Sequence, residues 1–243
     1  MTVSHCMFDF DGTLVDSLGD ILQCLTSAFA KCGVPVESLH IATVMQLQLK
    51  EAIASISPQS NAAQIAAVVA EFRNLYDASD YPATKLKTGV TVLLPELKAR
   101  SIGMSIVSNK RHFPTLRILD KFGLRTCFDA VYNHDMDPGK PVMSKSTMIA
   151  RAIAEQGLSR ETTLYIGDSE VDVLAAGENG LTSVIVESGY GDIENFKRRP
   201  DYIVKELSEI LAIDGLIRQT PQKLGRERGL SYIFPLRTSN VLL

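Results

Sequence analysis

The sequence contains no tryptophan, no long hydrophobic run and only four scattered cysteines. No apolar stretch approaches the roughly 20 residues that a membrane-spanning helix needs. The N-terminus shows no basic segment followed by an apolar one, as a secretory signal would. The cysteines form no CxxC pair and no zinc-like spacing with histidine. We therefore expect a cytoplasmic protein with reduced thiols that does not interact with a membrane.

An excess of charge of either sign is also missing. The chain of 243 residues carries 25 Lys and Arg against 28 Asp and Glu, for a net charge of −3, and 45% of it is hydrophobic. Such a balance argues against a nucleic-acid-binding surface and against wholesale disorder. The glycine patterns GxGxxG and GxxxxGK[ST] are absent, which argues against a dinucleotide-binding or P-loop domain. The length suits one large domain, or a domain that carries an insertion.

Short apolar runs alternate with helix-like stretches over most of the chain. The runs predicted as strands are Val3–Phe8, Ile102–Val107, Ala130–Tyr132, Thr163–Ile166, Ser183–Val186 and Tyr202–Val204. The predicted helices between them are Val90–Arg100, Phe113–Phe122, Thr147–Gln156 and Asp172–Glu178. Strands that are apolar throughout are typical of a parallel sheet buried on both faces. The pattern predicts an α/β fold, a Rossmann-like doubly wound parallel sheet.

One segment interrupts this alternation. From about residue 18 to residue 78 no run predicts a strand, whereas Ile21–Lys31, Leu39–Ile56 and Ala62–Tyr76 have helical periodicity. We interpret this segment as an inserted helical cap, with Thr84–Gly89 as the linker that returns to the sheet. The predicted division is a core of residues 1–15 and 88–212, a cap of 16–87 and a C-terminal extension of unknown role, 213–243.

Two carboxylates, Asp9 and Asp11, follow the first predicted strand, and Gly12 and Thr13 come next. Residues two apart in a strand share a face, so the two side chains are expected to point the same way. Two like charges about 4 Å apart repel by roughly 4 kcal/mol at an effective dielectric near 20. A bound divalent cation would neutralise the pair, which predicts a functional site here.

Two further strands end in polar groups. Ser108, Asn109 and Lys110 follow one of them, and the segment 167–172, which contains Asp168 and Asp172, follows the other. Open α/β sheets bind ligands beyond the carboxyl ends of their strands, so these groups are expected to meet. Carboxylate and hydroxyl oxygens suit Mg²⁺, which retains waters and accepts phosphate oxygens.

These motifs together resemble the haloacid dehalogenase superfamily of phosphohydrolases, and in particular its phosphoglycolate phosphatase-like branch with a helical cap. The matching segments are 9–17, 107–110, a lysine near 145 and 166–172. The resemblance implies a Mg²⁺-dependent phosphatase that hydrolyses a small phosphorylated metabolite through an aspartyl-phosphate. It favours a phosphoglycolate-like substrate, and a monomer or homodimer.

The resemblance also implies the roles of the acidic residues. Asp9 corresponds to the nucleophile, and Asp11 to the general acid that protonates the leaving group and then activates water. The Asp9 carboxylate, the Asp11 backbone carbonyl and the Asp168 carboxylate correspond to the Mg²⁺ ligands. Asp172 corresponds to a residue that orients the motif lysine or a metal-bound water.

The same resemblance assigns the phosphoryl-binding groups. Ser108 and the backbone amide of Asn109 correspond to donors to the phosphoryl oxygens, and Lys145 to the lysine that balances the charge of nucleophile and phosphate. The family's usual Lys-Pro pair would select Lys140 instead. Lys140 lies 28 residues before Asp168, however, whereas Lys145 opens a predicted helix with Ser144 as a suitable N-cap. We favour Lys145.

Several alternatives remain open from the sequence. Lys110 and Arg111 are interpreted either as contacts of phosphate or of a substrate carboxylate, or as solvated side chains. A sugar phosphomutase or a nucleotidase would use the same scaffold, and a binding protein without catalytic activity would share the fold. Asp11 argues against haloacid dehalogenase chemistry, which lacks this second aspartate.

Overall fold

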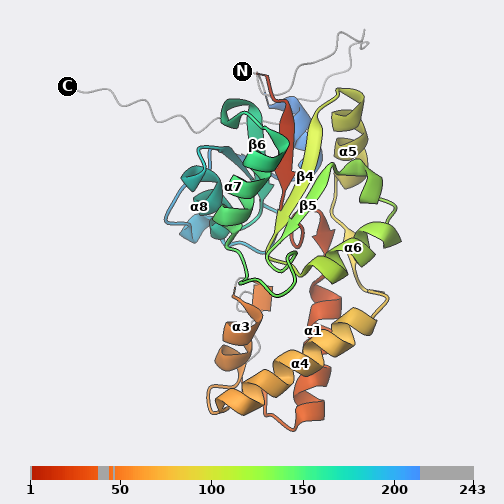
Figure 1. The fold of residues 1–243 in the computed structure, drawn as a ribbon, viewed down its shortest axis with the longest axis vertical. Coiled ribbons are helices and arrows are strands. Elements are labelled where there is room, and N and C mark those ends of the chain that lie inside the picture. The colour runs from red at the N-terminus through yellow and green to blue at the C-terminus, as the bar shows by residue number, and fades with distance from the viewer. Residues whose placement is uncertain (1, 38–43, 46, 214–243) are drawn as a thin grey trace, which may run out of the picture.

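The computed structural model describes residues 2–37, 44–45 and 47–213, and its centre is a parallel sheet of six strands (Figure 1). The strands lie in the order β5-β4-β1-β6-β7-β8, and every neighbouring pair is parallel. Their bounds are β1 His5–Phe8, β4 Gly103–Ser108, β5 Ala130–Asn133, β6 Thr163–Gly167, β7 Thr182–Val186 and β8 Tyr202–Val204. The predicted α/β fold class is confirmed.

Helices cover both faces of this sheet. Figure 1 shows α5 and α6 on one side of the sheet and α7 and α8 on the other. Their bounds are α5 Val90–Ala99, α6 His112–Lys121, α7 Lys145–Gln156 and α8 Glu170–Glu178. Short 3₁₀ turns span Arg125–Cys127, Arg160–Thr162, Ile193–Asn195 and Leu207–Ala212. None of the helices in the described ranges is long and apolar enough to cross a membrane.

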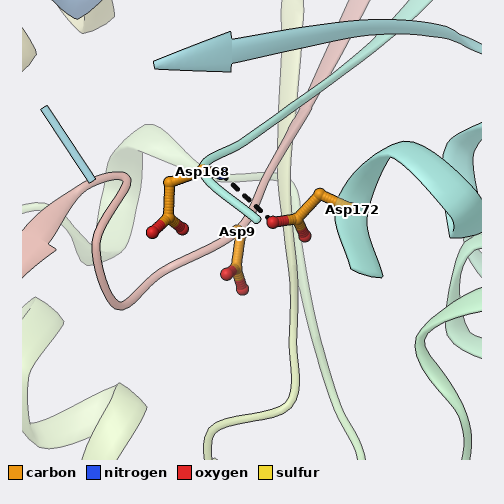
Figure 2. Close-up of side chains that lie close together, drawn as sticks. All are labelled: Asp9, Asp168 and Asp172. Carbon is orange, nitrogen blue, oxygen red and sulfur yellow. Dashed lines mark hydrogen bonds between the residues drawn. The ribbon is translucent and has the colours of Figure 1, made fainter. Parts of the chain in front are cut away.

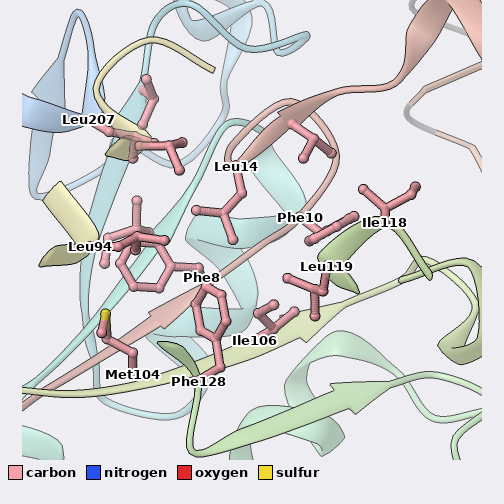
Figure 3. Packing of buried hydrophobic residues seen from close by; sticks show 14 of the residues in the cluster. Phe8, Phe10, Leu14, Leu94, Met104, Ile106, Ile118, Leu119, Phe128 and Leu207 are labelled. Atoms are coloured by element: carbon pink, nitrogen blue, oxygen red, sulfur yellow. The ribbon is translucent and has the colours of Figure 1, made fainter. Parts of the chain in front are cut away.

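The side chains of β1 divide between two apolar clusters, one on each face. Phe8 belongs to the cluster shown in Figure 3, where its ring meets Phe128 edge to face at a centroid distance of 6.2 Å. Met7 belongs to the cluster on the opposite face, against α7. Both side chains are fully buried. This alternation follows from the two-residue period of a strand, and it fixes the register of β1 at the centre of the sheet.

The helix that carries Lys145 begins and ends at local signals. The Ser144 hydroxyl accepts a hydrogen bond from the Thr147 amide at 3.1 Å, as predicted for an N-cap. At the other end Gly157 adopts a left-handed conformation with φ 62°. These caps fix where α7 begins and ends, and they place Lys145 in its first turn.

Within the described residues, helices α1, α3 and α4 lie between β1 and the rest of the sheet in the sequence, and they sit below the sheet in Figure 1. Their bounds are α1 Leu18–Cys32, α3 Leu49–Ile56 and α4 Ala62–Ala78, and we call them the inserted helices. The predicted helix Leu39–Ile56 is wrong in part. Gln48 has an extended backbone, so α3 begins only at Leu49. The Leu47 side chain is 44% exposed, so Leu47 lacks the packing that the helical pattern implied. Part of that predicted helix lies outside the described residues.

The chain enters and leaves the inserted helices through a short two-stranded ribbon. β2 (Val15–Asp16) and β3 (Lys85–Leu86) pair antiparallel. β3 lies within the predicted returning linker Thr84–Gly89 and was not predicted, because a two-residue strand shows no periodicity in sequence. The predicted bounds 1–15, 16–87 and 88–212 place the division near this ribbon, and they stay a prediction. Of the predicted extension 213–243, all but the first residue lies outside the described residues.

Candidate active site

The carboxyl ends of β1, β4 and β6 face the inserted helices across a pocket of about 360 Å³. Apolar side chains of α1 and α4 line one side of it, among them Ile21, Leu25, Val69 and Phe72. The opposite side holds most of the predicted site residues: Asp9, Asp11, Ser108, Asn109, Lys145 and Asp168. The structure therefore brings together residues that are more than 150 positions apart in the sequence. A pocket of this size suits a small molecule.

Asp9 follows β1 directly and is only 7% exposed. Its Oδ2 lies 3.2 Å from the Lys145 ammonium, and its buried Oδ1 has no hydrogen-bond partner among the described residues. Burial raises the pKa of the Asp9 carboxyl to about 6, although Lys145 and a hydrogen bond from Ser108 act in the opposite direction. A buried carboxylate oxygen without a partner is costly, and this one lies where a ligand can reach it.

Lys145 is held between two carboxylates. Its side chain is 4% exposed, and its ammonium lies 2.5 Å from Asp172 Oδ1 as well as 3.2 Å from Asp9. Burial opposes the charge of Lys145, but Asp172 and Asp9 outweigh it and hold the lysine pKa above its ordinary value. Lys140, in contrast, is 72% exposed and lies 3.7 Å from Asp137. The structure therefore places Lys145, and not Lys140, against Asp9.

Asp172 is engaged on both carboxylate oxygens. Oδ1 accepts from Lys145, and Oδ2 accepts from the backbone amide of Ser169 at 2.9 Å. Oδ2 also accepts from the backbone amide of Asp168 at 3.1 Å (Figure 2). Burial would raise the pKa of Asp172, but Lys145 and the bonds from Ser169 outweigh it and lower the pKa. Asp172 therefore orients the lysine and the loop after β6.

Asp168 is buried in that loop, where the Thr13 hydroxyl and the Tyr190 amide donate to its two oxygens at 3.2 and 2.7 Å. Burial raises the pKa of the Asp168 carboxyl to about 8, and the charges of Asp172 and Asp9 add to this effect. Gly12, with φ 86°, passes so close that a side chain there would collide with the Asp168 carboxylate. The turn after β1 thus requires glycine on both counts.

These carboxylates are close enough together to hold a metal ion. Oxygen atoms of Asp9, Asp168 and Asp172 lie within 4.8 Å of one another (Figure 2). Asp172 already faces the Lys145 ammonium and accepts two backbone amides on its other oxygen, whereas each Asp168 oxygen accepts one hydrogen bond, so the carboxylates of Asp9 and Asp168 are the ones that suit a cation. Two buried anionic oxygens favour a hard ion such as Mg²⁺. The predicted carbonyl ligand of Asp11 stays a prediction.

Asp11 lies outside this carboxylate group. The strand ends at Phe8, so the strand alternation that we applied to Asp9 and Asp11 does not extend to them. Lys110 Nζ lies 2.9 and 3.0 Å from the two oxygens of Asp11, and the Ser17 hydroxyl donates at 2.5 Å. The sequence predicted a bound cation to neutralise the pair; the structure adds Lys145 against Asp9 and Lys110 against Asp11.

The interpretation of Lys110 and Arg111 as solvated side chains is wrong. The Lys110 side chain is 5% exposed; burial opposes its charge, but Asp11 and Tyr76 together outweigh burial and hold the lysine pKa above its ordinary value. Arg111 forms two hydrogen bonds with Asp77 of α4, at 2.9 and 2.6 Å, and lies 3.6 Å from Asp135. Both cations are thus engaged by carboxylates of the chain itself.

Two tyrosines at the site were missed by the sequence analysis. The Tyr76 hydroxyl, from α4, accepts a hydrogen bond from Lys110 at 2.8 Å. Tyr190 holds Asp168 through its amide, while its hydroxyl donates to Asp16 of β2 at 2.7 Å. The helical period of α4 could have placed Tyr76 on a buried stripe, but no sequence signal identified Tyr190.

The family described as haloacid dehalogenase-like hydrolase matches residues 6–186, which include Asp9, Ser108, Lys145 and Asp168. The chain belongs to this family. The resemblance stated from the motifs is therefore confirmed for this hydrolase.

The relatives of this hydrolase include proteins named as phosphatases and one named as a kinase. The chain is 31% identical over 218 residues to a phosphoglycolate phosphatase of Synechococcus elongatus, covering 88% of this chain and 98% of the relative. It is 27% identical over 220 residues to the tyrosine-protein kinase PtkA of Mycobacterium tuberculosis, covering 90% and 72%. Among solved structures, a haloacid dehalogenase-like hydrolase from Streptococcus pneumoniae has a TM-score of 0.74 at 29% identity, covering 86% of this chain and 97% of that one.

Proposed function

We propose that this hydrolase cleaves the phosphate monoester of a small metabolite, with Asp9 as the nucleophile. The observation that carries the proposal is the buried Asp9 Oδ1, which has no partner among the described residues and faces a pocket lined by Ser108 and Lys145. This oxygen can attack phosphorus without first giving up a hydrogen bond of its own. Covalent catalysis divides one difficult displacement into two easier ones.

In the first step an Asp9 oxygen attacks the phosphorus atom and forms an acyl phosphate as the ester P–O bond breaks. The departing alcohol oxygen takes a proton from Asp11. Lys145 balances the charge that Asp9 and the phosphoryl group bring together, since its ammonium lies 3.2 Å from Asp9. Ser108, at the end of β4, and the Asn109 amide donate to phosphoryl oxygens.

In the second step water attacks the phosphorus atom and gives a proton to the Asp11 carboxylate. The bond between Asp9 and phosphorus breaks, which releases inorganic phosphate and regenerates both aspartates. The inserted helices, with their apolar lining, act as a cap that keeps other water away from the acyl phosphate. Asp11 thus serves as acid and then as base.

Asp9 and Asp168 would hold the Mg²⁺ ion of this site. When bound, the ion supplies positive charge that offsets the repulsion between the carboxylates and a phosphate dianion. Asp172 would not be a ligand of the ion, because Lys145 and two backbone amides occupy its oxygens. Its role is to hold Lys145 in reach of Asp9.

Magnesium is expected to raise the melting temperature, and to raise it more at high pH than at low pH. The folded state keeps a proton on Asp168 up to about pH 8, whereas the unfolded chain loses it near the ordinary value of 3.8. Without a cation, stability therefore falls as the pH rises between these values. At a hundredfold excess over the dissociation constant, Mg²⁺ should add about 2.7 kcal/mol, or roughly 5 to 10 °C.

Thermal unfolding with and without Mg²⁺, near pH 6 and near pH 8, measures this effect. Asp168→Asn should abolish the gain, while Asp80→Asn, which changes a 93% exposed carboxylate, should retain it. A gain that is the same in the Asp168 variant, or that shrinks as the pH rises, would contradict the assignment of the ion to these carboxylates.

Among substrates we favour phosphoglycolate, which agrees with the name of the relative from Synechococcus elongatus. The test is a panel of phosphoglycolate, p-nitrophenyl phosphate, a hexose phosphate and a nucleoside monophosphate, assayed with Mg²⁺ and with a chelator. We expect phosphate release that needs Mg²⁺, with the highest kcat/KM on phosphoglycolate. Isomerised sugar phosphate without phosphate release would indicate a phosphomutase instead. Equal, negligible release with Mg²⁺ and with chelator would indicate a binding protein.

A further inference from the structure

The three N–H donors of the Lys110 ammonium are matched by three acceptors. Two are the oxygens of Asp11, at 2.9 and 3.0 Å, and the third is the Tyr76 hydroxyl at 2.8 Å. Because an ammonium has three donors, Lys110 in this arrangement has none left for a substrate. The position of the Asp11 carboxylate is thus fixed by Lys110, with the Ser17 hydroxyl as a second contact.

The Tyr76 hydroxyl is in turn fixed by α4. Its ring stacks on Phe72 at a centroid distance of 5.4 Å and meets Tyr81 edge to face at 5.1 Å. The residue is 3% exposed, so its phenol cannot move without its helix. The Lys110 ammonium also lies 4.8 Å from the Tyr76 ring centroid, within the range of a cation–π contact. Tyr76 therefore constrains Lys110 through both its ring and its hydroxyl.

The end of α4 is attached to α6 by two arginines beside this contact. Arg111, which precedes α6, forms an ion pair with Asp77, and Arg117 of α6 donates to the Asp77 carbonyl oxygen at 2.8 Å. Tyr76 and Lys110, which line the pocket, are more buried than Arg111, at 3% and 5% exposed against 23%. A shift of α4 away from α6 would withdraw the phenol from Lys110 and leave that ammonium free to turn.

We propose that Tyr76 is a positioning residue, which acts through Lys110 to hold the Asp11 carboxylate where it exchanges a proton with the leaving-group oxygen. The proposal rests on the proposed function, in which Asp11 is the acid and base. Proton transfer by Asp11, which follows β1, then depends on a hydroxyl that the inserted helices supply. The catalytic arrangement is then complete only when α4 lies against α6.

Leaving-group dependence tests this role. Tyr76→Phe keeps the ring contacts and removes only the hydroxyl. The alkoxide of phosphoglycolate needs a proton as it departs, whereas p-nitrophenolate does not. The ratio of kcat/KM on phosphoglycolate to kcat/KM on p-nitrophenyl phosphate is therefore expected to fall about tenfold in Tyr76→Phe, a part of the 10²–10⁴-fold that acid catalysis contributes.

The matched control is Tyr81→Phe, in the same ring cluster. The buried Tyr81 hydroxyl has no hydrogen-bond partner in the described residues, so this variant should keep the wild-type ratio. A Tyr76→Phe protein that loses activity equally on both esters, or on neither, would show that the hydroxyl does not act on proton transfer. Wild-type protein that hydrolyses neither ester would overturn the proposed function and, with it, this inference.

A double variant gives a second, independent result. Lys110→Met should lower the same kcat/KM ratio, and adding Tyr76→Phe to it should change the ratio little further, because both act along one path. Additive losses in the double variant would mean that Tyr76 does not work through Lys110.

Discussion

Asparagine in place of Asp9 is expected to lower kcat by at least about 10⁴-fold, since loss of a nucleophile removes most of the catalysis. The amide has nearly the same shape as the carboxylate but cannot displace the ester oxygen from phosphorus. The substitution also removes a buried charge whose Oδ1 has no partner in the described part of the chain. The folded state should therefore persist. Phosphate release under single-turnover conditions measures the loss, and circular dichroism checks the fold.

A control for this variant is Asp80→Asn, which makes the same chemical change at a 93% exposed carboxylate and should leave kcat within about twofold. If the folded Asp9→Asn protein released phosphate at a rate close to that of the wild type, Asp9 would not be the nucleophile.

The second large effect is expected at Lys145, and it falls on both turnover and stability. Lys145→Met leaves Asp172, which is fully buried, without its cation, and breaking a buried pair typically costs about 3–5 kcal/mol. It also removes the charge beside Asp9, for which we expect a loss of at least about 10²-fold in kcat. Lys140→Met, at a 72% exposed side chain, should change stability by less than about 1 kcal/mol and keep most of the activity.

The double variant Lys145→Met/Asp172→Asn separates the two effects. Removing both charges should recover much of the lost stability, while activity stays low because no cation faces Asp9. Urea unfolding and phosphate release, measured on the same preparations, give both quantities. Full activity in Lys145→Met together with inactive Lys140→Met would reverse the assignment of the lysine.

Much of the sheet and of the site follows from local patterns. The apolar runs that form β1, β4 and β6 are buried on both faces, so apolar residues occur at consecutive positions and not only at alternate ones. Because parallel strands end at one edge, Asp9, Ser108 and Asp168 could be expected to meet there. Lys145 was preferred as the site lysine because Ser144, directly before it, is a suitable helix N-cap, which is also a local signal.

What could not be predicted depends on contacts between distant residues. The Lys110–Asp11 pair spans 99 positions and the Lys110–Tyr76 bond spans 34, and neither leaves a periodic signal. The ribbon of β2 and β3 is two residues long on each side, too short for alternation to show. Leu47 lies within the predicted helix Leu39–Ile56, but its side chain is 44% exposed, because sequence alone does not say which apolar residues find a packing partner.

The central claim is that an oxygen of Asp9 becomes bonded to phosphorus during turnover. Acid quenching of the enzyme within the first turnover on phosphoglycolate or p-nitrophenyl phosphate, followed by peptide mass spectrometry, tests it most directly. We predict the added mass of one phosphoryl group on the peptide that contains Asp9, absent from the Asp9→Asn protein. A phosphoryl group found on another residue, or on none while turnover proceeds, would contradict the account.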